Sequence, residues 1–141
     1  MTAGARPLPW LPQRPPMVLL AGMLEAGPDG GTALARVDPG AWYADPEGAM
    51  PAWFGLELMA QAIAACRSQY LAGSGRPPRG GYLVSARGYR SAVPAFAPGA
   101  ELAVRVRLEL EDPSGLCGFH CEIRQGEAEL ASASLKVMER P

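Results

Sequence analysis

The sequence predicts an α+β domain in which an antiparallel sheet wraps around one long central helix. Two observations carry this prediction. Residues 51–72 form a helix-length segment with almost no polar side chains, and residues 101–111 alternate apolar and polar side chains. The first pattern is typical of a helix that is buried on every side, and the second of a strand with one buried face. Strands grouped around a single helix place the chain in the α+β class.

The composition suits one folded domain. The chain has 141 residues, of which 48% are hydrophobic and 19% are charged. This balance provides a core and is too apolar for intrinsic disorder, so residues 1–141 are expected to form a single domain. The net charge of −1 offers no positive field to a polyanion, which argues against nucleic acid as a partner. No run of about 18 apolar residues is present, so no membrane-spanning helix is expected.

The N-terminal third predicts an arm, a hairpin and a loop. Residues 1–16 contain five prolines and are expected to form an extended arm that docks on the body. Residues 17–24 and 32–37 are apolar runs separated by a turn cluster, which predicts a hairpin. Residues 41–49 form a loop that carries Trp42 and Tyr43.

The central segment predicts a helix over residues 51–72, with Pro51 at the first helical position and Gly73 as the stop. In its first two-thirds the only polar side chains are Glu57 and Gln61, one turn apart on the same face. Burying a charge without a role costs several kcal/mol. Glu57 is therefore the main candidate for a functional residue; the alternative is a carboxylate that only hydrogen-bonds Gln61 and the backbone.

The C-terminal half predicts strands only. After a loop at 74–81, residues 82–90 and 101–111 form strands joined by a turn-rich link, residues 119–123 alternate again, and residues 127–138 return as the last strand. The apolar residues of residues 127–138 also fit the spacing of a helix, so a helix is the alternative for this last segment. We expect these four strands to form a meander. A single sheet bent around a buried helix is the hot-dog fold.

The cysteines do not predict a metal site. In a strand, Cys117 and Cys121 share one face while His120 points to the other, so the three side chains do not converge on one ion. We expect His120 to face solvent, and no metal to be bound. With Cys66 these are too few cysteines for a disulfide framework. Reduced thiols indicate a cytoplasmic location.

Three segments carry a resemblance to a known family. Residues 11–20, 50–61 and 81–85 resemble the signature segments of 3-hydroxyacyl-acyl-carrier-protein dehydratases, which are hot-dog enzymes of fatty-acid and polyketide synthesis. The match is closer to a divergent bacterial branch found with aryl-polyene-type pigment clusters, because Pro-Ala-Trp at 51–53 and Val-Pro-Ala-Phe at 93–96 are typical of that branch. The resemblance covers roughly residues 8–138.

The resemblance implies loss of water from a 3-hydroxyacyl thioester carried on the phosphopantetheine of acyl carrier protein, with no cofactor of the chain's own. It implies a homodimer or a heterodimer with a paralogue. Glu57 matches the family's helix carboxylate, which helps the hydroxyl leave, and Gln61 matches the glutamine that helps hold it. Backbone N–H groups at 51–53 are expected to polarise the thioester carbonyl.

Further residues are expected to bind substrate or carrier protein. The substrate-binding set comprises Gln13, Tyr43, Met50, Pro51, Ala52, Trp53, Phe54, Gln61, Gly81, Tyr82, Leu83 and Val84. The aromatic residues and the methionine near the helix start are either walls of an acyl tunnel or ordinary core. A basic patch for the carrier protein, with ordinary solvation as the alternative, comprises Arg76, Arg79, Arg87 and Arg90.

The sequence also departs from the family. The loop at 41–49 has no histidine, and the nearest aligned residue is Tyr43, while Gln13 and Ala21 replace a usual histidine and aspartate. Three hypotheses follow. The chain is a dehydratase with Glu57 as acid and an unidentified base, a non-catalytic acyl-carrier-binding subunit of an active paralogue, or a hot-dog acyl thioesterase.

Overall fold

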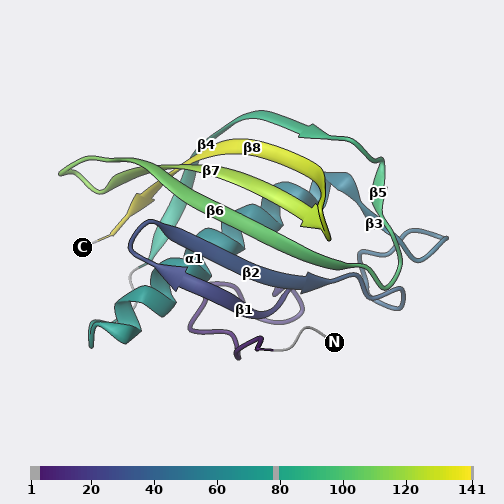
Figure 1. Cartoon of the computed structure of the whole chain (residues 1–141), viewed down its shortest axis with the longest axis horizontal. Coiled ribbons are helices and arrows are strands. Elements are labelled where there is room, and N and C mark those ends of the chain that lie inside the picture. Colours follow the sequence, from purple (N-terminus) through teal and green to yellow (C-terminus); the bar gives the residue numbers. More distant parts are fainter. Residues whose placement is uncertain (1–3, 78–79, 141) are drawn as a thin grey trace.

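The computed structural model describes residues 4–77 and 80–140, and it confirms the hot-dog arrangement (Figure 1). A six-stranded antiparallel sheet has the order β1-β2-β6-β7-β8-β4 and curves around one helix, α1. The elements are β1 (Leu20–Gly27), β2 (Gly30–Arg36), β3 (Met50–Pro51), η1 (Ala52–Phe54), α1 (Gly55–Gly73), β4 (Gly81–Ser91), β5 (Ala95–Phe96), β6 (Glu101–Glu111), β7 (Leu116–Gln125) and β8 (Ala128–Glu139).

The period-two pattern positions the first half of β6 as predicted, whereas Leu110 is exposed beyond an irregularity after Leu108. Leu102, Val104 and Val106 are buried against the helix side, whereas Arg105 and Arg107 are exposed on the outer face of the sheet. Residues 128–139 form a strand, so the helical alternative for this segment is wrong. Long cross-strand registers join β7 to both neighbours and hold the middle of the sheet.

The predicted four-strand meander is wrong in one respect. The strands β6, β7 and β8 follow one another, but β4 pairs with β8 at the sheet edge and β2 lies against β6. The reason is the helix between β2 and β4, which carries the chain across the sheet before β4 begins (Figure 1). The strand at 81–91 therefore becomes an edge.

The helix begins later than predicted. Pro51 has φ −53° and ψ 141°, which is extended backbone, and it belongs to β3, where Met50 pairs with Phe96. The Ala52 N–H donates to the carbonyl of Pro94 at 3.0 Å, and a single 3₁₀ turn precedes the α-helix. Pairing with a distant segment thus overrides the preference of proline for the first helical turn.

The predicted N-terminal arm is described from residue 4 onwards, because residues 1–3 lie outside the described residues, and this part lies against the body and shortens the first strand. The strand β1 begins at Leu20, because residues 17–19 are bound instead by a helix side chain described below. Arg6 and Met23 exchange backbone hydrogen bonds of 2.7 and 2.8 Å, so the arm covers part of the free edge of β1. At the opposite edge, β4 has no pairing strand on its outer side among the described residues.

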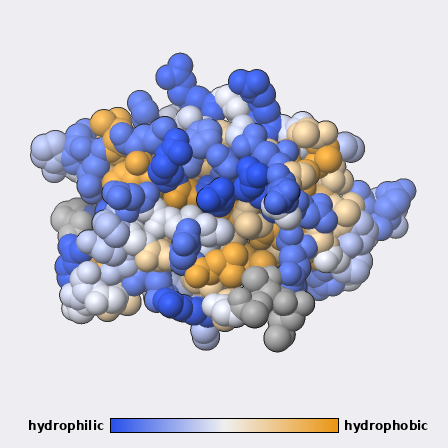
Figure 2. Space-filling view, viewed as in Figure 1, coloured by the Kyte–Doolittle hydropathy of each residue, from blue (hydrophilic) through white to orange (hydrophobic). Residues whose placement is uncertain are grey.

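The helix is not buried on every side. Leu58, Met59 and Ala62 are fully buried under the sheet, but Glu57, Ala60, Ala64 and Arg67 form a partly exposed strip along the helix. The strip lies beside the arm and the start of β4. The face of the molecule shown in Figure 2 is mainly hydrophilic, with smaller apolar areas between charged side chains. Across residues 4–77 and 80–140, no helix combines the length and hydrophobicity that a membrane span needs.

Candidate functional site

The partly exposed strip of α1 lines a cavity of about 340 Å³. The arm closes one side with Pro12 and Gln13, and β4 closes the other with the segment 80–83. The remaining walls are mainly aliphatic, from the helix and from Val137 on β8. The cavity is an elongated apolar groove with a carboxylate, Glu57, at the N-terminal end of its helix wall.

Glu57 is held by two amide side chains. Its Oε2 atom accepts a hydrogen bond of 2.8 Å from Gln61 Nε2 and a longer contact of 3.5 Å from Gln13 Nε2. The first bond follows from helix geometry, since residues four apart are neighbours on one face. Among the described residues no partner is seen for Oε1, so this oxygen is available to a ligand in the cavity.

Gln61 is fully buried and joins the helix to the arm. Its Oε1 accepts from the Leu19 N–H at 2.9 Å, and its Nε2 also donates to the Met17 carbonyl at 2.7 Å. All of its hydrogen-bonding groups are thereby used. Because both amide ends are fixed by backbone, the Nε2 group presents a donor to Glu57 in one fixed direction.

Gln13 brings an unpaired acceptor to the same place. Its Oε1 is buried and has no hydrogen-bond partner in the described structure. Buried polar atoms are nearly always paired in native proteins, and an orphaned one calls for an explanation. An amide oxygen beside Glu57 is suited to accept a proton donor from a bound ligand or from a second chain.

The far end of the cavity is an ion-pair cluster that the sequence did not indicate. Arg67 lies 2.8 Å from Glu139 and 3.4 Å from Glu111, and the first pair is only 13% and 10% exposed. The Cys117 thiol donates to Glu139 at 3.2 Å. These contacts join residues far apart in the chain, so no local pattern signals them.

The same cluster is the one group in the described residues with metal-ligand geometry. The ligand atoms of Glu111, Cys117 and Glu139 lie within 4.8 Å of one another. Arg67 already forms ion pairs with both carboxylates, however, and burial together with the bond to Glu139 raises the pKa of the Cys117 thiol to about 12. A protonated thiol is a poor metal ligand, and the guanidinium already occupies the carboxylates. The cluster is therefore better explained as a buried ion-pair network than as a metal site.

The structure brings together some of the predicted substrate-binding residues. Gln13, Gly81, Tyr82 and Leu83 line the cavity together with Glu57, the predicted acid, and Gln61 lies behind Glu57. Sequence reasoning missed Arg67 and the alanines of the helix strip. Small residues on one helix face were a signal of a groove, but they read equally well as close packing.

Other predicted residues lie elsewhere. Met50 is fully buried core, and Trp53 is 71% exposed in the single chain, so neither lines this cavity. Val84 is exposed on β4 and is not part of the cavity wall.

Two further predicted residues belong to an aromatic cluster around Trp42. Phe54 and Tyr43 pack against Trp42, with ring centroids 5.6 and 5.8 Å from the Trp42 ring. The Tyr43 hydroxyl accepts a hydrogen bond of 2.9 Å from the Asp38 N–H.

The expected oxyanion role of the helix start is wrong for residues 51 and 52. Pro51 has no N–H, and that of Ala52 is used by Pro94. The Tyr89 hydroxyl donates to the carbonyl of Ala52, and the Tyr89 side chain lies against Gly55. Tyr89, a residue of β4, therefore fastens the edge strand to the start of the helix.

The predicted basic patch is distributed over two places. Arg76 follows the helix and lies over the Tyr70 ring, with its guanidinium carbon 5.6 Å from the centroid. Arg87 and Arg90 are exposed on β4. Arg79 lies outside the described residues.

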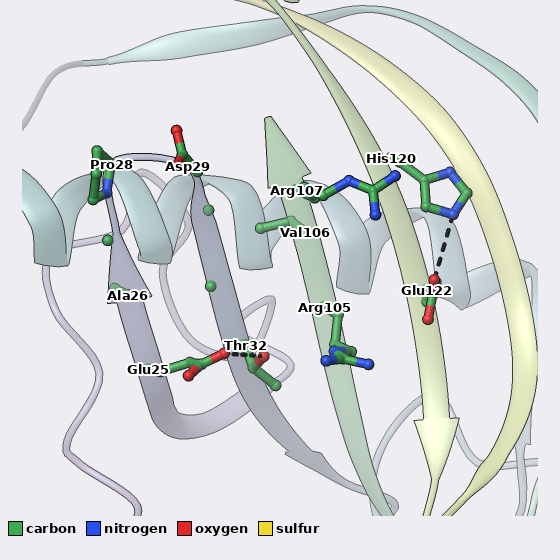
Figure 3. Close-up of a pocket in the computed structure, with 13 residues that line it drawn as sticks. Glu25, Ala26, Pro28, Asp29, Thr32, Arg105, Val106, Arg107, His120 and Glu122 are labelled. Carbon is green, nitrogen blue, oxygen red and sulfur yellow. Dashed lines mark hydrogen bonds and ion pairs between the residues drawn. The ribbon is translucent and has the colours of Figure 1, made fainter. Parts of the chain in front are cut away.

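His120 lies on the other side of the sheet from the helix. Its Nε2 is 3.5 Å from Glu122, and both line a groove of about 490 Å³ on the outer face (Figure 3). In this view α1 passes behind the strands, and Arg107 lies beside the imidazole. Cys117 and Cys121 are buried on the inner face, as the strand alternation predicts. His120 is therefore separated from Glu57 by the sheet.

Comparison with known proteins identifies the family. The family model for ApeP-like dehydratases, described as ApeP dehydratase, matches residues 6–141, and the chain belongs to this family. A structure titled as the dehydratase heterocomplex ApeI:P from Xenorhabdus doucetiae is 27% identical, with a TM-score of 0.87 over 96% of this chain and 93% of that chain.

More distant structures share the fold. A sigma28-regulated virulence protein of Campylobacter jejuni is 10% identical, with a TM-score of 0.68 over 86% of this chain and 78% of that chain. A probable thioesterase from Bartonella henselae is 16% identical, with a TM-score of 0.60 over 79% and 90%. Among curated proteins, a sequence search finds no significant match.

Proposed function

We propose that this chain is one subunit of a heteromeric dehydratase that acts on 3-hydroxyacyl thioesters of acyl carrier protein, and that it supplies Glu57 as the acid while a paralogous hot-dog chain supplies the base. One observation carries the proposal. Glu57 is held with one free oxygen in an elongated cavity, and no histidine lines that cavity in the described part of the chain.

The chemistry requires two groups. A base removes the proton from C2 of the acyl chain, the C2–C3 double bond forms, and the hydroxyl on C3 leaves with a proton from an acid. Protonated Glu57 would give that proton and release water. The proton taken by the base must then return to the carboxylate before the next turnover. Gln61 fixes the carboxyl orientation throughout, because its own amide is held by the backbone of residues 17 and 19.

The cavity walls support an acyl substrate. Ala60, Ile63 and Ala64 provide an aliphatic surface along the helix, and Leu83 and Val137 face them. At ~1.5 Å per residue, the helix places Arg67 about 15 Å from Glu57 along its axis. The groove therefore offers room for a medium-length chain whose reacting end lies beside the carboxylate.

The open strand edge supports a second subunit. The β1 edge is partly covered by the arm, whereas β4 is unpaired on its outer side in the described structure and exposes Tyr82, Leu83 and Val84. An exposed apolar edge strand invites pairing with another chain. The similar ApeI:P structure is a dehydratase heterocomplex, which favours a paralogue as partner over a second copy. The three free, buried cysteines suit the reducing cytoplasm.

The test is mass spectrometry of a 3-hydroxyacyl-carrier-protein incubated with the purified chain, with a histidine-containing hot-dog dehydratase chain from the same genome, and with both. We expect loss of one water only with both chains, and no loss when Glu57→Gln replaces the wild type. Glu129→Gln, which changes an exposed carboxylate on β8, is the matched control and should leave turnover unchanged.

Two results would overturn the proposal. Turnover by this chain alone would show that it contains its own base, and Tyr43→Phe would then be the next variant. If the partner chain turns over substrate equally well with the wild type and with the Glu57→Gln variant, the Glu57 carboxyl takes no part in the reaction. Release of free acid in place of the unsaturated thioester would instead support the thioesterase hypothesis. That hypothesis is supported only by the shared fold.

A further inference from the structure

The open edge strand β4 carries positive charge and no negative charge. Between Gly81 and Ser91 the charged residues are Arg87 and Arg90, and both are exposed. Neither forms an ion pair within residues 4–77 and 80–140. Two arginines without an ion pair on this open edge of the sheet are a feature that the cavity chemistry does not explain.

Both arginines lie on the same face of the sheet. Arg87 pairs with Ser134 and Arg90 with Ser132, and an irregularity in β4 between the two arginines accommodates the one additional residue. Lys136, two residues further along β8, pairs with Ser85 on the same face. At the positions that pair with Ser85, Arg87 and Arg90, β8 therefore provides small hydroxyls and one more cation, and no carboxylate to neutralise the arginines.

Antiparallel pairing of β4 with a second copy of itself, centred on residues 87–90, sets these charges against each other. A two-fold axis at Arg87 or at Arg90 places that arginine opposite its own copy, and an axis midway between them places Arg87 opposite Arg90 of the second copy. Like charges directly opposite on neighbouring strands are destabilising. Edge strands in natural proteins use charge in this way to prevent unwanted pairing.

We propose that Arg87 and Arg90 select the partner of the β4 edge: they disfavour a homodimer and favour a chain whose own edge strand carries carboxylates at the facing positions. The exposed side chains of Tyr82, Leu83 and Val84 supply the apolar contact area for either pairing, and the arginines decide between the two. The inference rests on the proposed heteromeric dehydratase, and it adds the chemistry of the partner strand.

The chain itself provides an acidic partner for the test. The variant Arg87→Glu with Arg90→Glu presents carboxylates on an otherwise identical edge. We expect wild type and variant to be monomeric when separate at micromolar concentration, and to form a one-to-one dimer when mixed, measured by native mass spectrometry and analytical ultracentrifugation. The mixed dimer should weaken as NaCl is raised, because its charges lie at a partly exposed interface.

A neutral variant and a displaced control complete the design. Arg87→Thr with Arg90→Thr removes the repulsion and should allow homodimers with affinity at least roughly tenfold above that of wild type. Arg105→Glu with Arg107→Glu places the same charges on β6, away from the edge, and should form no mixed dimer with wild type.

Three outcomes would overturn the inference: a tight wild-type homodimer unchanged by the threonine variant, no mixed dimer with the folded glutamate variant, or a mixed dimer formed equally by the β6 variant. Far-UV circular dichroism and urea unfolding establish that each variant is folded. None of these measurements uses substrate, so a failure of the dehydratase assay and a failure of partner selection are distinguishable.

Discussion

Gln61 links Glu57 to the N-terminal arm. Its side-chain amide donates a hydrogen bond of 2.8 Å to the Glu57 carboxylate and is itself hydrogen-bonded to the backbone of residues 17 and 19. The arm closes the cavity at this end through Pro12 and Gln13. A fully buried side chain thus couples the position of a candidate acid to the docking of a segment that is distant in sequence.

Replacing Gln61 with leucine is expected to destabilise the fold and release the arm. Leucine keeps the volume but leaves the Leu19 N–H and the Met17 carbonyl without their partner. At ~1–3 kcal/mol for each of these two unsatisfied groups, the free energy of unfolding should fall by about 2–6 kcal/mol. Urea unfolding measures this loss.

Gln69→Leu on the same helix is the matched control for Gln61→Leu. Gln69 is only partly buried and makes no side-chain hydrogen bond in the described structure, so its change should stay within about 0.5 kcal/mol. Equal losses at both positions would contradict the role assigned to Gln61.

The sequence predicted the parts of this site that lie within one element. The pairing of Glu57 with Gln61 follows from two polar residues one turn apart in an apolar segment, and the buried face of β6 follows from its alternation. The pairing of β3 with β5, which displaces the helix start, is non-local and has no signature around Pro51. For the same reason the salt bridges of Arg67 could not be predicted.

The cluster at the far end of the cavity is expected to respond to the loss of either charge more than to the loss of both. Arg67→Met leaves Glu139 and Glu111 close together without a cation, and should cost about 3–5 kcal/mol of unfolding free energy, the range for a broken buried pair. The double variant Arg67→Met with Glu139→Leu should cost less than Arg67→Met alone. Chemical unfolding of these two variants, of the single variant Glu139→Leu and of wild type gives the coupling.

A surface pair provides the comparison for this cycle. Arg107 and Glu109 lie 3.3 Å apart with side chains 67% and 49% exposed, so Arg107→Met should change the stability by less than about 1 kcal/mol. If the Arg67 variant behaves like the Arg107 variant, the cluster is no more than a solvated contact.

The cysteines predict a loss of stability at alkaline pH. Burial is the largest cause that raises the pKa of each thiol, Cys66, Cys117 and Cys121, to about 12. In the unfolded chain a thiol titrates near ~8.5. The folded state therefore keeps protons that the unfolded state loses, so this stabilisation is complete below about pH 8.5 and decreases as the pH rises towards 12.

Urea midpoints at neutral pH and in the range above pH 9 measure this effect. Changing all three cysteines to alanine should reduce the slope of stability against pH in that range, although it also lowers the stability at every pH. In the native protein at pH 8, none of the three thiols should react with iodoacetamide faster than the protein unfolds. Rapid labelling of any one of them would contradict the buried, protonated state.

Because Tyr89 contacts Gly55, the substitution Gly55→Ala is expected to destabilise the wild type and to stabilise a variant that lacks the Tyr89 side chain. A Cβ at Gly55 would overlap the Tyr89 hydroxyl, which is bound to the Ala52 carbonyl and cannot move without losing that bond. Gly55→Ala should therefore cost about 1–3 kcal/mol in the wild type, as overpacking does. In a Tyr89→Leu background the overlap is gone, and alanine should stabilise the helix by up to about 1 kcal/mol relative to glycine. Thermal and urea unfolding of the four proteins test this, and the same cost in both backgrounds would show that Tyr89 does not fasten β4 to the helix start.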